Sequence, residues 1–315
     1  GSSQKYDRLV IASGARPFIP NISGIDTVSN LFTMRTAQDA IAIKKAVSSS
    51  KEKSVIIIGG GYIGLETAAS LKKIGAQVTI LEREKRILAR VTAPVMSDYF
   101  LELHQQNDVE VLTNKNVISI KKANGLNNVF CDDDTSFKAE IIIVGVGILV
   151  NTELAKSAGL DIEQGIKVNE YTQTDDKSIY AIGDCTFHYN PHYKEFIRLE
   201  SVQNAIDQSK VAAASICGKA FIYDTIPWFW SNQFDVKLQM VGLSKGYNDL
   251  IVRKEETEKS SFSVWYFKDD ALLAVDAINN GKAFVLGTRF IKGKQKINKA
   301  KLVDGSIPMQ PNTFL

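Results

Sequence analysis

The chain has 315 residues, enough for two or three domains that each bury a hydrophobic core. Hydrophobic residues make up 44% of it and charged residues 23%, which is typical of folded globular proteins and excludes a disordered chain. The net charge of +3 is too small to indicate nucleic acid or a membrane surface as a partner. The three cysteines are far apart and form no CxxC motif, which excludes a visible disulfide framework and favours a reducing cytoplasm.

The first third of the chain predicts strands and helices in alternation. Some segments repeat apolar side chains at helical spacing and others form unbroken apolar runs. In chain order we therefore expect strand, helix, strand, helix and strand, over residues 6–12, 36–47, 54–58, 62–74 and 77–82. The last three elements form a βαβ unit, whose strands are parallel and buried on both faces.

The rest of the chain continues this pattern and then changes. We expect a helix, four strands, a further strand that ends in Gly-Asp and a further helix, over residues 96–106, 109–112, 117–120, 128–131, 139–144, 179–184 and 202–216. Beyond Gly218 aromatic side chains alternate along the sequence, which favours a third, antiparallel α+β domain.

The most specific motif is Gly59-x-Gly61-x-x-Gly64, because it directly follows an apolar strand and opens a helix. The first glycine permits a tight turn, the second lets the backbone approach a pyrophosphate, and the third lets helix and strand pack closely. The N-terminus of the helix attracts the phosphate charge. This context favours a dinucleotide site over glycines that serve only a turn.

Glu82 closes the second strand of this unit, where a carboxylate can accept hydrogen bonds from the adenine-ribose 2′-hydroxyl and would repel a 2′-phosphate. NADH is therefore favoured over NADPH. Arg83 and Arg86 lie nearby and are able to hold that phosphate, which leaves NADPH as the alternative. Gly183-Asp184 follows another apolar strand and is either a second binding turn or an ordinary turn whose carboxylate caps the next segment.

A series of segments in order carries a family resemblance: Gly59 to Glu66, Leu81-Glu82, Arg90 to Pro94, Gly145-x-Gly147 with Asn151, Ala181 to Cys185, Arg198 to Ala205 and Trp228 to Gln233. Together they resemble the FAD-dependent ferredoxin reductases of the pyridine nucleotide-disulfide oxidoreductase superfamily, a group that contains putidaredoxin reductase, rubredoxin reductase and dioxygenase reductase components. The resemblance covers essentially the whole chain. It implies an α/β fold with a Rossmann-like NAD-binding domain, a partial FAD-binding α/β domain and a C-terminal α+β domain.

The resemblance also implies domain boundaries and an activity. Residues 1–22 would be a residual FAD-domain strand and motif, 23–145 the NAD-binding domain, 146–221 the second part of the FAD domain, and 222–315 the reductase domain. Because the chain starts at Ala12-Ser13-Gly14 of the family pattern, we expect the N-terminal FAD-binding βαβ unit to be missing. The implied activity is that of a cytoplasmic NADH:ferredoxin oxidoreductase, which passes electrons from NADH through FAD to a ferredoxin or rubredoxin.

Site residues follow from the same resemblance, residue by residue. Glu66 would lie near the nicotinamide and the flavin; alternatively it is an ordinary residue of the first helical turn. The implied NAD contacts are Gly59, Gly60, Gly61, Tyr62, Ile63, Gly64, Glu82, Arg90, Gly145 and Gly147. The implied FAD contacts are Ser13, Gly14, Arg16, Gly183, Asp184, Ser201, Val202 and Trp230, although Trp230 could equally be a core residue.

The predicted protein partner is an acidic [2Fe-2S] ferredoxin or a rubredoxin. Residues Arg289 to Lys301 contain six cations and no acidic residue, and together with Arg198 they would form a docking patch; the alternative is a solvated face. His188 and His192 are spaced HxxxH, but Tyr189 to Pro191 favour a loop, so we expect no metal. Cys131 and Cys185 are expected in the core.

Two other functions stay open at the level of sequence. One is a related flavoprotein of the NADH oxidase, nitrite reductase or apoptosis-inducing factor type. The other is a non-catalytic NAD-binding fragment. An unpaired strand edge would also favour a homodimer.

Overall fold

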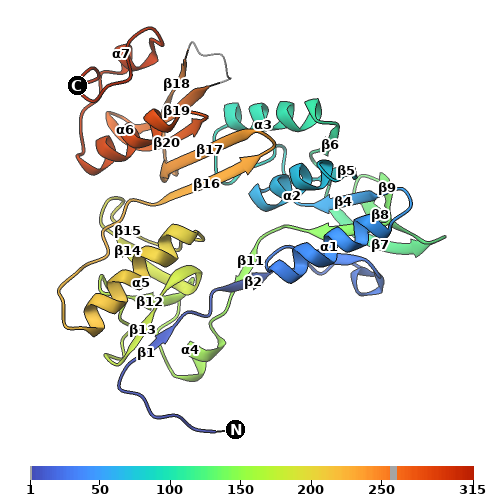
Figure 1. Cartoon of the computed structure of the whole chain (residues 1–315), viewed down its shortest axis with the longest axis horizontal. Helices are drawn as coiled ribbons and strands as arrows, with labels where there is room; N and C mark the ends of the chain where they lie inside the picture. The colour runs from blue at the N-terminus through green and yellow to red at the C-terminus, as the bar shows by residue number, and fades with distance from the viewer. Residues whose placement is uncertain (1, 256–260) are drawn as a thin grey trace. The chain divides into compact units, whose positions relative to one another are not determined.

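A computed structural model describes residues 2–255 and 261–315, which divide into two compact units (Figure 1). Unit 1 comprises residues 1–15, 150–231 and 236–315, and unit 2 comprises residues 16–149 and 232–235. The chain passes between the units within or next to the strands β2 (Ala15–Pro17), β11 (Ile148–Val150) and β16 (Trp228–Gln233). The four domain ranges expected from the sequence stay predictions.

Unit 2 is built on a parallel sheet. Its five strands lie in the order β3 (Leu31–Thr33), β10 (Ile141–Val144), β4 (Ser54–Ile58), β5 (Gln77–Leu81) and β6 (Val109–Leu112). All four pairings are parallel. The crossovers are made by α1 (Ala37–Ser49), α2 (Tyr62–Lys72) and α3 (Pro94–Gln106), as Figure 1 shows. This arrangement confirms the Rossmann-like fold, because unbroken apolar strands such as β4 need a cover on both faces.

A three-stranded antiparallel sheet is inserted before β10. It contains β7 (Val117–Ala123), β8 (Leu126–Cys131) and β9 (Ser136–Ala139). The prediction of one strand over residues 139–144 was wrong, because β9 ends before Glu140 and β10 begins after it. The Glu140 carboxylate accepts hydrogen bonds from the backbone N–H groups of Lys51 and Glu52 at 2.9 and 3.0 Å, so this residue leaves the strand geometry to join a turn. A short 3-10 helix, η1 (Ile25–Thr27), precedes β3.

The first part of unit 1 contains two small sheets. β1 (Leu9–Ile11) pairs in parallel with β13 (Ile179–Ala181). The second sheet consists of β12 (Ile166–Val168), β14 (Thr186–Asn190) and β15 (Glu195–Ile197). The helices of this part are α4 (Glu153–Ser157), the 3-10 turn η2 (Gly183–Cys185) and α5 (Val202–Ile216).

Two strand predictions in this part were too long. The strand predicted over residues 6–12 forms only as β1, and the one over 179–184 ends at Ala181. Gly183 has a φ of 78°, which turns the chain into η2 instead of extending the strand. The predicted Gly-Asp ending is therefore a turn beyond the strand.

The C-terminal part of unit 1 is an antiparallel sheet with helices, as the aromatic alternation predicted. Its strand order is β16, β17 (Val236–Gly242), β20 (Ala271–Ile278), β19 (Phe262–Lys268) and β18 (Asp249–Lys254). The helices are α6 (Gly281–Lys292) and α7 (Lys299–Val303). The fully buried side chains of Trp265 and Phe267 pack with Phe290 of α6 in one core.

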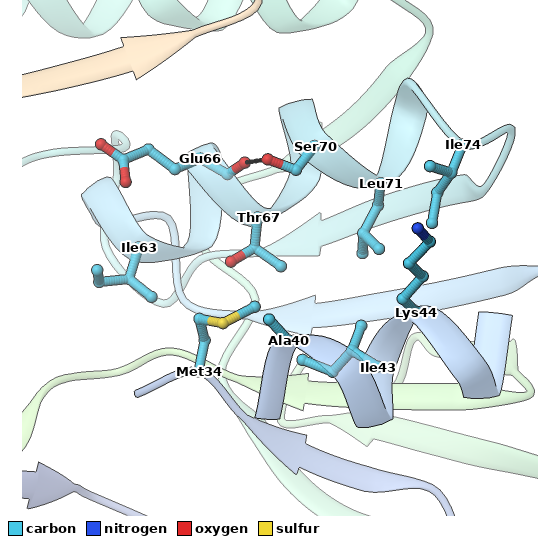
Figure 2. Close-up of a pocket in the computed structure, with 10 residues that line it drawn as sticks. All are labelled: Met34, Ala40, Ile43, Lys44, Ile63, Glu66, Thr67, Ser70, Leu71 and Ile74. Atoms are coloured by element: carbon cyan, nitrogen blue, oxygen red, sulfur yellow. Dashed lines mark hydrogen bonds between the residues drawn. The ribbon is translucent and has the colours of Figure 1, made fainter. Parts of the chain in front are cut away.

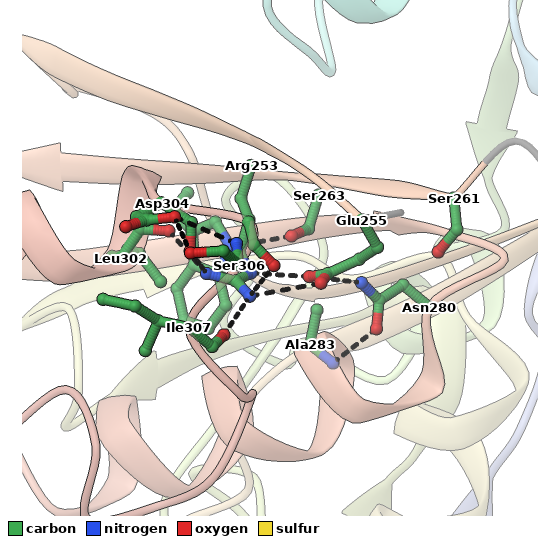
Figure 3. Close-up of polar contacts among 12 residues, drawn as sticks. Arg253, Glu255, Ser261, Ser263, Asn280, Ala283, Leu302, Asp304, Ser306 and Ile307 are labelled. Carbon is green, nitrogen blue, oxygen red and sulfur yellow. Dashed lines mark hydrogen bonds and ion pairs between the residues drawn. The ribbon is translucent and has the colours of Figure 1, made fainter. Parts of the chain in front are cut away.

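A buried arginine fastens the end of the chain to this sheet (Figure 3). Arg253 of β18 is 0% exposed and pairs with Glu255 at 2.6 Å. Its guanidinium donates to four backbone carbonyl oxygens of the C-terminal segment, those of Leu302, Asp304, Gly305 and Ile307. The planar, five-donor guanidinium suits this set of acceptors, so Arg253 holds residues 302–307 against the sheet.

Candidate functional site

The glycine motif of unit 2 forms a tight turn between β4 and α2. Gly59 has a φ of 110°, and a Cβ atom there would lie 2.5 Å from the carbonyl oxygen of Gly145. A Cβ atom on Gly64 would lie 2.1 Å from the carbonyl oxygen of Gly59. Both positions therefore require glycine for the backbone to close, which agrees with the roles predicted for the first and third glycines.

The middle glycine differs because space lies in front of it. Apart from its neighbours along the chain, no atom of residues 2–255 or 261–315 lies within 4 Å of a Cβ built on Gly61. Gly61 is also the N-cap of α2, and no side chain caps this helix end. An uncapped helix N-terminus beside open space is what an anionic pyrophosphate needs, so the residues present fit a dinucleotide.

Three predicted NAD residues meet at one edge of the parallel sheet. Gly59, Glu82 and Gly145 follow β4, β5 and β10, which are neighbours in the sheet. The N–H of Gly145 donates to Ile58 at 2.8 Å, and the N–H of Gly59 donates to Leu81 at 2.9 Å. Ligands of open α/β sheets bind outside the carboxyl ends of the strands, which is this edge.

Glu82 makes contacts that the sequence did not predict. Its carboxylate accepts hydrogen bonds from the backbone N–H groups of Gly60 and Glu84, at 2.6 and 2.7 Å. The side chain is half-buried, and a carboxylate has about four acceptor positions, so capacity remains for a ribose hydroxyl. Its predicted ribose contact stays a prediction.

The two arginines near Glu82 are already engaged. Arg86 donates to the hydroxyl of Ser97 at 2.6 Å and to the carbonyl of Ala89 at 2.9 Å. Arg83 is exposed and pairs with Glu84 at 3.2 Å. Arg86 therefore holds the loop between β5 and α3. The alternative interpretation, a site for NADPH, needed this side chain to bind the 2′-phosphate.

The remaining predicted NAD residues surround the same turn. Arg90 is exposed in the loop after β5, which folds back so that the N–H of Leu88 donates to the carbonyl of Gly60 at 3.0 Å. Tyr62 and Ile63 are the first residues of α2. Gly147 has a φ of 128° and follows β10 by a short loop.

A pocket of ≈ 390 Å³, which sequence reasoning missed, lies between α1 and α2. Its lining is mostly apolar: Met34, Ala40, Ile43, Lys44, Ile63, Glu66, Thr67, Ser70, Leu71 and Ile74. Figure 2 shows the Glu66 carboxylate pointing away from Lys44 of the facing helix. Glu66 is the fifth residue of α2 and half-buried, so it lies beyond the first helical turn. Its predicted nicotinamide contact stays a prediction.

In unit 1 two predicted FAD motifs follow neighbouring parallel strands. Ser13-Gly14 comes after β1 and Gly183-Asp184 after β13, and Ile11 pairs with Ala181 at the ends of these strands. The Ser13 hydroxyl donates to the carbonyl of Asn151 at 2.7 Å, and the Asn151 amide donates back to Ser13 at 2.8 Å. Both motifs therefore lie at the carboxyl ends of parallel strands, where open α/β sheets bind their ligands.

The N-terminus of α5 lies beside the Gly183 turn. A Cβ atom on Gly183 would lie 3.5 Å from the Cβ of Ala205, in the first turn of α5. Ser201 is the N-cap and accepts from the N–H of Asn204 at 3.1 Å, and Val202 is 58% exposed at the first helical position. The structure thus brings together four predicted FAD residues: Gly183, Asp184, Ser201 and Val202.

Trp230 and Arg16 are the other predicted FAD residues. Trp230 is half-buried in β16, and its ring centroid lies 5.5 Å from that of Trp228. Trp228 in turn packs on Phe284 of α6, so Trp228 is a residue of the hydrophobic core. Arg16 is exposed on β2 in unit 2. The flavin contacts of Trp230 and Arg16 stay predictions.

The basic stretch is less positive than its sequence indicates. Lys296 pairs with Asp270 at 2.8 Å, and Lys299 pairs with Asp249 at 2.8 Å. The fold supplies these carboxylates from β18 and the β19–β20 turn, far away in sequence. Arg198 likewise pairs with Glu200 at 2.6 Å.

The histidine pair has a different setting from the one predicted. His188 lies in strand β14 and not in a loop, and it is buried. His192 lies after β14, where its Nε2 is 2.8 Å from the carbonyl oxygen of Asp224. Within the described ranges no group of three or more metal-ligating side chains gathers anywhere. Cys131 and Cys185 are buried, as predicted, and Cys217 is exposed.

With this geometry, the comparisons with known proteins identify the class. Residues 1–209 match the pyridine nucleotide-disulphide oxidoreductase family, and residues 228–312 match the reductase C-terminal family. The chain belongs to the pyridine nucleotide-disulphide oxidoreductases and carries the C-terminal domain of the reductase branch.

Individual relatives show which members of the family this chain is similar to. Putidaredoxin reductase of Pseudomonas putida is 38% identical over 315 residues, which cover 98% of this chain and 74% of the relative. The ferredoxin reductase subunit of 5,5′-dehydrodivanillate O-demethylase from Sphingobium sp. is 35% identical and covers 99% of this chain and 76% of its own length. The solved covalent putidaredoxin reductase–putidaredoxin complex superposes with a TM-score of 0.91 at 37% identity, over 98% of this chain and 75% of that one. The predicted resemblance and fold class are confirmed.

Proposed function

We propose that this protein is an NADH-dependent flavoprotein reductase that passes electrons through FAD to a ferredoxin or rubredoxin. The observation that carries the proposal is that each unit has its own turn suited to a dinucleotide, located at the carboxyl ends of parallel strands. The named relatives support the ferredoxin acceptor.

The residues of unit 1 fit FAD. Gly14 and Gly183 have φ values of 59° and 78°, so each motif is a tight turn that presents backbone groups at the strand ends. Asp184 and the N-terminus of α5 would hold the polar chain of the cofactor. When bound, FAD supplies acceptance of a hydride from NADH and release of single electrons to the acceptor.

The residues of unit 2 bind and orient NADH. The N-terminus of α2 would hold the pyrophosphate and Glu82 the adenine ribose, with Glu66 toward the nicotinamide. Because Arg86 is committed to Ser97 and Ala89, we propose a preference for NADH over NADPH. No side chain of this site needs to act as a proton-transfer catalyst.

The acceptor proposal includes an acidic partner. Four cations of the basic stretch have no ion pair with any residue in the described ranges: Arg289, Lys292, Lys294 and Lys301. Together with Arg198 they would steer an acidic [2Fe-2S] ferredoxin toward the reductase domain.

We also propose a location and an assembly state. Three free cysteines favour a reducing cytoplasm. No helix in the described part of the chain combines the length and apolar character needed to span a membrane. β1 pairs with β13 along one edge, and within the described ranges it has no second strand partner in its sheet, which favours a homodimer. Analytical ultracentrifugation tests the dimer.

The test of the function is a comparison of electron acceptors. NADH oxidation by the FAD-supplemented protein is measured with a [2Fe-2S] ferredoxin, with rubredoxin and with oxygen alone. Faster NADH oxidation in the presence of either the ferredoxin or the rubredoxin supports the proposal. Oxidation that oxygen alone sustains would indicate an NADH oxidase, and NADH binding without any oxidation would indicate a non-catalytic fragment.

A further inference from the structure

A buried glutamine lies directly behind the predicted flavin turn. Gln208, in the middle of α5, is 0% exposed. Its Oε1 accepts a hydrogen bond of 2.7 Å from the backbone N–H of Gly183. Burying an amide side chain is costly unless its polar atoms are bonded, so this contact needs an explanation within the fold.

The same oxygen takes part in a second contact with the turn. The Thr186 hydroxyl lies 3.0 Å from Oε1 of Gln208 and 2.9 Å from the carbonyl oxygen of Gly183. Since a hydroxyl has one hydrogen, it donates to one of these two acceptors at a time. Gly183 is thus tied to a small polar cluster through its N–H, and also through its carbonyl oxygen when Thr186 donates to it.

The amide nitrogen of Gln208 fixes the orientation of its side chain. Nε2 lies 3.3 Å from Nδ1 of His188, which is buried in β14. The His188 ring stacks edge-on against Tyr223 at 4.9 Å, and the Tyr223 hydroxyl donates to Asn204 at 2.7 Å. This network joins β14, α5 and the turn, and the N–H of Gly183, which can only donate, requires the Gln208 oxygen to face it.

We propose that Gln208 is the positioning residue that holds the Gly183–Asp184 turn in its left-handed form and so presents Asp184 to the flavin. The inference rests on the proposed function, because it takes this turn as the FAD contact. Gln208 does not touch the cofactor in this account. It acts through the backbone N–H of Gly183, whose φ of 78° must be kept for Asp184 to project from η2.

The test compares three variants of the full chain. Gln208→Met keeps the length and helix propensity of the side chain but loses both polar atoms. Gln208→Glu keeps an oxygen acceptor toward Gly183. Gln233→Met is the control, because Gln233 is also 0% exposed and also bonds a buried histidine, His104 at 2.9 Å, but lies in unit 2.

Three quantities are measured: thermal stability, the FAD dissociation constant by flavin fluorescence, and hydrogen exchange at the Gly183 amide. We expect Gln208→Met to weaken FAD binding by about tenfold or more and to expose the Gly183 amide to exchange. Gln208→Glu should recover most of the affinity. Gln233→Met should lower stability to a similar extent and leave FAD binding and the Gly183 amide unchanged.

Other results would overturn the proposal. Wild-type affinity in Gln208→Met, or an equal loss of affinity in Gln233→Met, would show that the turn does not depend on Gln208 specifically. Failure of the wild-type protein to bind FAD would instead refute the proposed function, and it is recognised without any variant.

Discussion

The carboxylate of Glu82 accepts a hydrogen bond of 2.6 Å from the backbone N–H of Gly60. The residue proposed to bind the adenine ribose therefore also holds the glycine turn proposed to bind the pyrophosphate. A single side chain directly after β5 would thus couple both halves of the proposed dinucleotide site.

This coupling predicts a large effect for Glu82→Ala. The variant loses the ribose acceptor and leaves two backbone N–H groups without their carboxylate, so the KM for NADH should rise by about tenfold or more. Glu82→Gln keeps one acceptor oxygen, so its KM for NADH should lie between those of Glu82→Ala and the wild type. Steady-state kinetics with NADH and NADPH checks both. An unchanged KM for NADH in Glu82→Ala would contradict the proposed role.

Two glycines of the motif should respond differently to alanine. In Gly64→Ala the new Cβ would lie 2.1 Å from a backbone oxygen, so we expect a loss of about 2 kcal/mol or more in the free energy of unfolding. In Gly61→Ala the new Cβ meets no described atom within 4 Å beyond its chain neighbours, and φ is −81°, so the protein should keep its stability but lose NADH affinity. Urea titration and NADH binding measure the two effects. Equal behaviour of both variants would refute the separate roles proposed for Gly61 and Gly64.

Stability should fall on mild acidification because of His188. Burial lowers the pKa of His188 to about 4 from an ordinary 6.5. Between these values the unfolded chain binds a proton that the folded protein rejects, so stability is complete above pH 6.5 and is lost toward pH 4, by at most about 1.4 kcal/mol per pH unit. Urea unfolding at several pH values measures this slope.

The matched variant for this prediction is His188→Gln, which should flatten the slope. Burial also lowers the pKa of His104, so part of the slope remains in that variant. A slope that His188→Gln leaves untouched would assign the effect to other groups.

Arg253 should be important for stability and not for binding. Arg253→Met leaves Glu255 and four carbonyl groups without their donor, and we expect a loss of about 3 kcal/mol in the free energy of unfolding. Lys237→Met, a change at an exposed position of β17, should cost almost nothing. Urea unfolding compares the two. A loss no larger than that of the control would show that residues 302–307 need no anchor.

The docking patch predicts a salt-dependent reaction. In Lys292→Glu the second-order rate of ferredoxin reduction should fall at low ionic strength, and the difference from wild type should vanish at high salt. Lys45→Glu, on α1 of unit 2, is the control for net charge. A wild-type rate that does not depend on salt would refute electrostatic steering.

Local sequence patterns predicted many helices and strands, because residues close together in the sequence largely determine where such elements form. The helix over residues 202–216 formed with those bounds, and the strand over 54–58 likewise, since their apolar spacing and caps are local signals. The turn at Gly59 was predictable because its glycines are adjacent in sequence.

Contacts between distant residues were not predictable. The pairing of Lys296 with Asp270 reduced a charge that the sequence alone overstated. Gln208 gave only a weak signal, a second polar residue four positions after Asn204 on a helix face that is otherwise apolar. Its role depends on Gly183, which the fold brings to it across 25 residues.

The most direct test is an absorption spectrum of the purified protein after incubation with FAD and removal of the excess, followed by anaerobic addition of NADH. We predict that the protein retains flavin with its visible absorption bands and that NADH bleaches them. Absence of retained flavin, or retained flavin that NADH does not bleach, would contradict it.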